Sequence, residues 1–127
     1  MNICLDTSGW IEIATAGPNA KAFTKALQPP HTLLSSVISL YEINKYLTRE
    51  TGAANAETLL AFIRNYPVIP VTEDLALHAA ELSAQHKLAM ADSLIYATSL
   101  AHNALLWTQD EDFKSLPHVK YFLKLKT

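Results

Sequence analysis

The sequence holds a single cysteine, Cys4, and only three glycines among its 127 residues. One cysteine excludes an internal disulfide and any zinc or iron–sulfur site built from several cysteines, and it favours a reducing compartment. There is no glycine-rich phosphate loop and no Gly-x-Ser-x-Gly elbow, which disfavours P-loop nucleotide hydrolysis and serine esterase chemistry. No apolar run approaches the roughly 18 residues of a membrane-spanning helix. The apolar start is too short for a signal peptide and lacks a basic leader, so we expect a cytoplasmic protein with no membrane association.

The composition is that of one globular domain. Half of the residues are apolar and 17% are charged, which excludes intrinsic disorder. Ten Lys and Arg stand against twelve Asp and Glu, so the strongly basic surface of many nucleic-acid-binding proteins is absent. We therefore expect a single domain spanning 1–127.

Apolar strand-like stretches alternate with helical patterns along the chain. We expect strands at 2–5, 32–38, 68–71, 104–108 and 119–123, and helices that include 19–27, one from Thr72 to about His86, and 91–102. Ser39 and Glu42 have the spacing of a capping box that opens the helix after the second strand. Strands alternating with helices predict a mainly parallel sheet covered on both faces, an α/β sandwich.

Four acids are expected at one edge of that sheet. Asp6 directly follows the first strand, and Glu42 lies in the opening turn of the helix after the second. A helix between parallel strands runs antiparallel to them, which brings Asp92 back to the same edge. Asp110 follows the strand 104–108 by two residues, and a fifth acid and three hydroxyls are predicted neighbours: Asp112, Thr7, Ser8 and Thr108.

Clustered carboxylates repel one another and take up protons unless a cation lies among them. Mg²⁺ or Mn²⁺ fits this need, because both ions prefer oxygen ligands and retain bound water. Such ions can activate water and stabilise the departing oxygen of a phosphodiester. Without the four acids the chain carries ten basic and eight acidic residues. Four cations are candidate phosphate contacts: Lys45, Arg49, Lys87 and Lys114.

Structural explanations compete with this hypothesis. Asp6 and Asp92 also fit as helix caps, while Asp110 also fits a turn with Asp112. An aspartyl-phosphate enzyme with Asp6 as nucleophile is disfavoured, because Ser8 stands where a second acid is needed. The histidines show no short metal-ligand spacing and are interpreted as surface or cap residues: His31, His78, His86, His102 and His118. Several aromatic residues at helical spacing are interpreted as core or interface: Trp10, Tyr41, Tyr46, Phe62 and Tyr96.

Four short motifs occur in a characteristic order: Leu5-Asp6-Thr7-Ser8, Glu42 after a Ser-rich strand end, Ala91-Asp92-Ser93-Leu94-Ile95, and Thr108-Gln109-Asp110-Glu111-Asp112-Phe113. In this order and spacing the chain resembles a PIN-domain ribonuclease, most similar to the VapC toxins of type II toxin–antitoxin pairs. The resemblance implies a PIN-like three-layer α/β/α sandwich with about five short strands. One departure is the run from His86 to Ala91, which lacks the glycine often found ahead of the third acid.

The resemblance also implies a function. Asp6, Glu42, Asp92 and Asp110 would bind Mg²⁺ or Mn²⁺ with help from Asp112, and Thr108 would orient the site. The implied reaction is endonucleolytic cleavage of cellular RNA that leaves a 5′-phosphate and a 3′-hydroxyl and arrests translation and growth. The implied partners are a VapB-like antitoxin and a second copy of the chain. Two other possibilities stay open: a housekeeping PIN nuclease, and an inactive PIN-like module that binds RNA or protein.

Overall fold

A five-stranded sheet forms the centre of the computed structural model, which describes residues 1–126; Thr127, the last residue of the predicted domain, lies outside the described residues. The strand order is β3-β2-β1-β4-β5 and every neighbouring pair is parallel. The strands are β1 (Asn2–Leu5), β2 (Thr32–Ser36), β3 (Val68–Ile69), β4 (Ala104–Thr108) and β5 (Val119–Tyr121). The predicted parallel sheet of about five short strands is confirmed.

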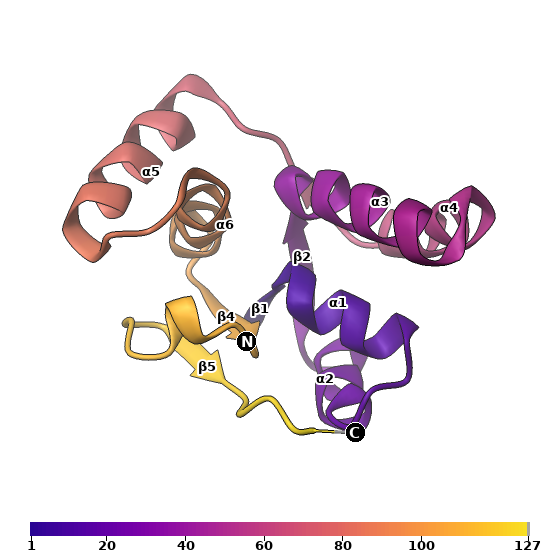
Figure 1. Ribbon diagram of the computed structural model, residues 1–127. Coiled ribbons are helices and arrows are strands. Elements are labelled where there is room, and N and C mark those ends of the chain that lie inside the picture. The colour runs from indigo at the N-terminus through magenta and orange to yellow at the C-terminus, as the bar shows by residue number, and fades with distance from the viewer. Residues whose placement is uncertain (127) are drawn as a thin grey trace.

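Helices cover both faces of the sheet, with α5 and α6 on one side and the earlier helices on the other (Figure 1). The helices are α1 (Thr7–Ala14), α2 (Ala20–Thr24), α3 (Val37–Thr51), α4 (Ala53–Ile63), α5 (Glu73–His86) and α6 (Met90–Ala101), with 3-10 turns η1 (Lys25–Leu27) and η2 (Glu111–Phe113). No helix within residues 1–126 has the length and apolar character needed to cross a bilayer. The arrangement is the expected three-layer α/β/α sandwich.

Side chains alternate between the two faces along each inner strand, and this alternation builds two cores. Ile3 and Leu5 pack against the layer of α1 to α4, whereas Cys4 between them packs against α5 and α6. Leu106 and Trp107 on β4 divide in the same way. Period-two alternation in nearly continuous apolar strands is what a sheet buried on both faces requires. Cys4 is fully buried.

Several predicted boundaries are wrong. The second strand ends at Ser36 rather than residue 38, because Ser36 Oγ accepts from Ile38 N at 3.1 Å and caps α3. The Ser39 capping box is therefore wrong, since Ser39 already lies inside α3. The expected helix 19–27 is divided into α2 and η1, and the strands expected at 68–71 and 119–123 are shorter.

Other local predictions agree with the structure. Thr72, the first residue of the predicted helix, caps α5 by accepting from Leu75 N at 3.2 Å. Lys87 ends α5 in the left-handed conformation, at φ 57° and ψ 46°. Glycine adopts that conformation most readily, so the chain makes the turn without the glycine whose absence the sequence showed. Trp10 and Tyr96 are buried, but Tyr41 is 64% exposed and does not belong to the core of this chain.

Candidate active site

Asp6 is placed by the end of β1 and fixed by three hydrogen bonds. It is buried and caps α1, with its Oδ2 accepting from Ser8 N at 3.3 Å and from the Ser8 hydroxyl at 2.7 Å. The Thr108 hydroxyl at the end of β4 donates to the same oxygen at 2.8 Å. The predicted capping role of Asp6 is confirmed, and it holds the carboxylate at the carboxyl edge of the sheet.

The hydroxyls that surround Asp6 also fix the loop after β4. Gln109 N donates to Ser8 Oγ at 3.1 Å, and Asp110 N donates to Thr108 Oγ1 at 2.9 Å. Ser8 and Thr108 therefore bind both Asp6 and the backbone that carries Asp110. Neutral hydroxyls suit this position because they orient the carboxylate and leave its charge in place.

Glu42 is held from the neighbouring helix rather than by a capping box. The Thr7 hydroxyl donates to Glu42 Oε1 at 2.7 Å, and its oxygen lies 2.9 Å from Ser39 Oγ. Ser39 is fully buried and sits between the two helices at this contact. The first turn of α1 thus orients two acids, Asp6 through Ser8 and Glu42 through Thr7.

A second group of acids consists of Asp92, Asp110 and Asp112. Each offers a carboxylate oxygen, and these oxygens lie within 4.8 Å of one another. Asp110 caps η2 by accepting from Asp112 N at 2.9 Å, which confirms the predicted turn. Asp92 lies in the first turn of α6, whose N-cap is Ala89, so the capping explanation for Asp92 is wrong.

One pocket of about 290 Å³ is lined by Asp6, Glu42, Asp92 and Asp110 together with Thr7, Ser8, Ile11 and Tyr46. The four acids predicted to converge therefore do so, although they come from four segments of the chain. Asp112 lines an adjoining pocket that shares Ser8 and Asp110 with the first. Tyr46, interpreted from sequence as a core or interface residue, stands at the wall beside the acids.

The pKa values of two of these acids are raised. Burial raises the pKa of Asp6 to about 6, with the Asp110 charge adding to the shift while hydrogen bonds from Ser8 and Thr108 oppose it. Burial also raises the pKa of Asp92 to about 7, and the charges of Asp110, Asp6 and Asp112 raise it further. A cation among such carboxylates would offset both the burial of their charge and their mutual repulsion.

The donors in the pocket fit a hard divalent cation. Carboxylate and hydroxyl oxygens are the ligands that Mg²⁺ and Mn²⁺ prefer, whereas zinc sites are built mainly from cysteine and histidine. Within residues 1–126, three side chains are close enough together to hold one metal ion: Asp92, Asp110 and Asp112.

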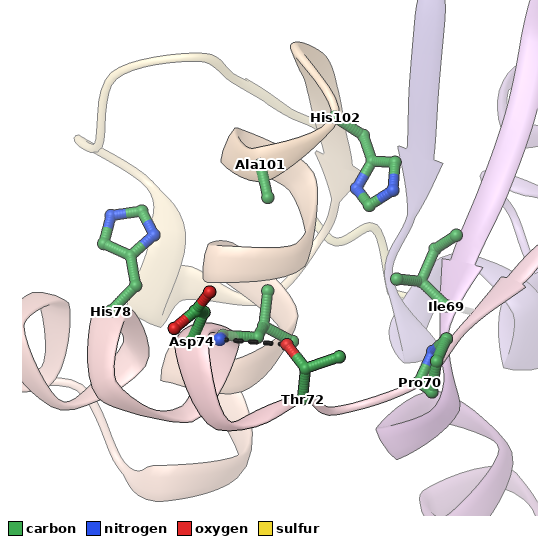
Figure 2. Close-up of a pocket in the computed structure, with 8 residues that line it drawn as sticks. Ile69, Pro70, Thr72, Asp74, His78, Ala101 and His102 are labelled. Atoms are coloured by element: carbon green, nitrogen blue, oxygen red, sulfur yellow. Dashed lines mark hydrogen bonds between the residues drawn. The ribbon is translucent and has the colours of Figure 1, made fainter.

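A cavity of about 490 Å³ lies elsewhere, between the segment after β3, α5 and the end of α6. Its walls are mainly apolar. Figure 2 shows His78 on α5 and His102 after α6 at separate sides of this cavity, with Asp74 on the α5 turn that Thr72 caps. His102 Nδ1 lies 3.2 Å from the Thr98 carbonyl of its own helix, which agrees with the predicted cap role.

The cations proposed from sequence do not line either pocket within the described part of the chain. Arg49 pairs with Glu50 at 3.6 Å, and its guanidinium lies over the Tyr46 ring. Lys114 lies over the ring of Tyr121. The lysine that the structure brings to the acids is instead Lys124, which lines the adjoining pocket. Lys124 follows β5, the last parallel strand, and this place at the carboxyl edge of the sheet was a sequence signal that could have found it.

A family model for the PIN domain matches residues 3–119. The chain belongs to the PIN domain family. A search of curated proteins finds no significant match.

Several solved structures share the fold. The toxin–antitoxin complex from Klebsiella pneumoniae is similar with a TM-score of 0.80 and 23% identity, over 97% of this chain and 99% of that one. VapBC2 from Rickettsia felis bound to a promoter DNA fragment has a TM-score of 0.77 and 20% identity, over 96% and 99%. The sarcin–ricin-loop-cleaving toxin VapC20 of Mycobacterium tuberculosis has a TM-score of 0.76 and 23% identity, over 91% and 95%.

Proposed function

We propose that this PIN domain, spanning 1–127, is a Mg²⁺- or Mn²⁺-dependent endoribonuclease and the toxin of a VapBC-type pair. Membership of the PIN family supports a nuclease. The observation that carries the proposal is the single pocket lined by Asp6, Glu42, Asp92 and Asp110. Its substrate would be cellular RNA, and cleavage in the cytoplasm would inhibit translation and growth.

Each acid has a role in this proposal. The carboxylates of Asp6, Glu42, Asp92 and Asp110 would hold the ion, with Asp112 assisting beside Asp110. When bound, Mg²⁺ or Mn²⁺ lowers the pKa of a coordinated water and stabilises negative charge on phosphate oxygens. Water adds to phosphorus and the P–O3′ bond breaks, which leaves a 5′-phosphate and a 3′-hydroxyl.

The protein's own groups prepare this site. Ser8 and Thr108 hold one oxygen of Asp6, which leaves the other oxygen for a ligand. Thr7 does the same for Glu42 through Oε1. Below the raised pKa values of Asp6 and Asp92, the protons on these carboxyls must leave before both can bind a cation.

The proposed partners are a VapB-like antitoxin and a second copy of the chain. Support for the antitoxin comes from the similar structures, several of which are toxin–antitoxin complexes, some of them bound to DNA. A basic antitoxin side chain placed among the acids would meet the negative charge of the pocket. A small reading frame upstream, with a DNA-binding segment and a basic, aromatic tail, would separate a toxin from a housekeeping PIN nuclease.

Cleavage of RNA by the purified chain tests the nuclease. With Mn²⁺ the wild-type chain should cut RNA into fragments with 5′-phosphates, and Asp6→Asn and Asp92→Asn should each abolish cutting. Glu81→Gln, which removes an exposed acid on α5, is the matched control and should cut like wild type. Cutting that survives in both Asn variants would reject the assignment. A chain that binds no Mn²⁺ at this edge and cuts no RNA would point to an inactive PIN-like module that binds RNA or protein.

A further inference from the structure

A second groove, of about 450 Å³, adjoins the acidic pocket and shares Ser8 and Asp110 with it. Its other lining residues are Gln109, Glu111, Asp112 and Lys124. A strand whose scissile phosphate lay at the four acids would continue into this groove. The groove is therefore where the next phosphate of a bound strand would be received.

Lys124 is the one lysine or arginine that lines either pocket within residues 1–126. Within those residues, Lys124 makes no ion pair of 4.0 Å or less. The salt bridge found there joins Arg49 and Glu50. The Lys124 ammonium group therefore stays available to an anion, although acids surround it. A polyanionic strand needs such a charge because an ion at the four acids neutralises only the phosphate being cut.

The segment that carries Lys124 is anchored beside the site by its two preceding residues. Phe122 N donates to the Thr108 carbonyl at 2.8 Å, and the Phe122 ring packs 4.6 Å from Phe23 and 5.4 Å from Trp107, measured between ring centroids. The Leu123 carbonyl accepts from Asn19 Nδ2 at 3.0 Å. Figure 1 shows this end of the chain beside α2.

A buried polar network joins the same anchor to the acidic loop. Asn19 Nδ2 also donates to Gln109 Oε1 at 3.0 Å. Glu12 Oε1 accepts from Gln109 Nε2 at 3.2 Å, and Glu12 Oε2 accepts from Asn19 N at 2.8 Å. Gln109 lies between Thr108 and Asp110, so the network sets the position of the Lys124 segment relative to the acids. Buried polar groups that are fully paired in this way rigidify their surroundings.

We propose that Lys124 is a substrate-binding residue that contacts a backbone phosphate of the RNA strand in this groove, next to the phosphate that is cut. This inference rests on the proposed function, because it takes RNA as the substrate. The contact is to phosphate and carries no base preference. Loss of this contact should therefore weaken the binding of all single-stranded RNA sequences to the same degree.

Binding of a fluorescein-labelled single-stranded RNA to the Asp92→Asn chain tests this contact without cleavage. Adding Lys124→Ala should weaken binding about threefold to tenfold at low salt, and should reduce the slope of log affinity against log salt by about 0.7. Lys124→Arg should retain both the affinity and the slope. Arg64→Ala removes one exposed charge at the end of α4, outside both pockets, and should change neither quantity.

Equal affinity and equal salt slope with and without Lys124→Ala would overturn the phosphate contact, as would a complete lack of salt-dependent binding. A loss equal to that of Arg64→Ala would show a general charge effect and would overturn it too. A different result would reject the proposed function: a wild-type chain that does not cut RNA in the presence of Mn²⁺. Because binding and cutting are measured separately, the two failures are distinguishable.

Discussion

The Thr108 hydroxyl donates to Asp6 Oδ2 at 2.8 Å, so residues 102 positions apart in sequence form one hydrogen bond at the edge of the sheet. The same hydroxyl oxygen accepts from Asp110 N. Thr108 is fully buried, and its hydroxyl orients one acid while fixing the backbone of another. The end of β4 and the end of β1 thus shape the candidate site together.

Thr108→Val tests this arrangement, because valine keeps the shape and removes the hydroxyl. We expect the free energy of unfolding to fall by about 1–3 kcal/mol, since Asp110 N and Asp6 each lose a buried partner. We also expect weaker Mn²⁺ binding, measured by calorimetry alongside urea denaturation. The control is Thr58→Val, whose exposed hydroxyl bonds only to its own helix. Unchanged Mn²⁺ affinity in Thr108→Val would show that this hydroxyl does not position Asp6.

The stability of the metal-free chain should depend on pH through Asp6 and Asp92. Both have pKa values raised above those of the unfolded chain, so the folded state binds more protons between about pH 4 and pH 7. The free energy of unfolding should therefore decrease as pH rises through this range. Urea denaturation in chelator should show a shallower decrease for Asp92→Asn than for wild type. A curve for Asp92→Asn parallel to those of wild type and Glu81→Gln would contradict the raised pKa of Asp92.

Metal binding should reverse that pH dependence. A cation that binds the carboxylates displaces the protons on Asp6 and Asp92, so Mn²⁺ affinity should rise between pH 5 and pH 8. At a hundredfold excess over its Kd, Mn²⁺ should raise the free energy of unfolding by about 2.7 kcal/mol. Titration calorimetry in buffers of different ionisation enthalpy counts the protons released. Binding that releases no proton at pH 6 would mean that these acids are already ionised.

The strand ends made part of the site predictable from sequence. Asp6 directly follows one buried strand and Asp110 follows another by two residues, and parallel strands bring such residues to one edge. Glu42 was predicted near the site, but the capping box was wrong because Ser36 offers a cap three residues earlier. Local patterns cannot decide between two serines at a strand end, whereas burial of Ser39 against Thr7 does.

The sequence does not place Lys124 and Tyr46 in the walls of these pockets, for a different reason. The position of Lys124 depends on contacts between segments far apart in the chain, such as the bond from Asn19 to Gln109 across 90 residues. The wall position of Tyr46 depends on how α3 packs beside α1, because the helical spacing of apolar residues fits a core position equally well. The period and spacing of apolar residues indicate which face of a helix or strand a residue occupies. They do not indicate which segment of the chain packs against that face.

Gly17→Ala should disrupt the network that anchors the Lys124 segment. A Cβ at residue 17 would clash with Glu12 Oε1, so the Glu12 side chain must move away from Gln109 and Asn19. We expect a loss of about 1–3 kcal/mol in the free energy of unfolding, because buried polar groups lose their partners.

The control for Gly17→Ala is Ala16→Gly in the same loop. Ala16 has φ 54°, a conformation that glycine tolerates better, so this substitution should change stability little or raise it. If the network positions Lys124, Gly17→Ala should also weaken RNA binding by the Asp92→Asn chain at a temperature where both chains are folded, while Ala16→Gly should not. Full RNA affinity in Gly17→Ala, despite lower stability, would show that the network stabilises the fold without setting the position of Lys124.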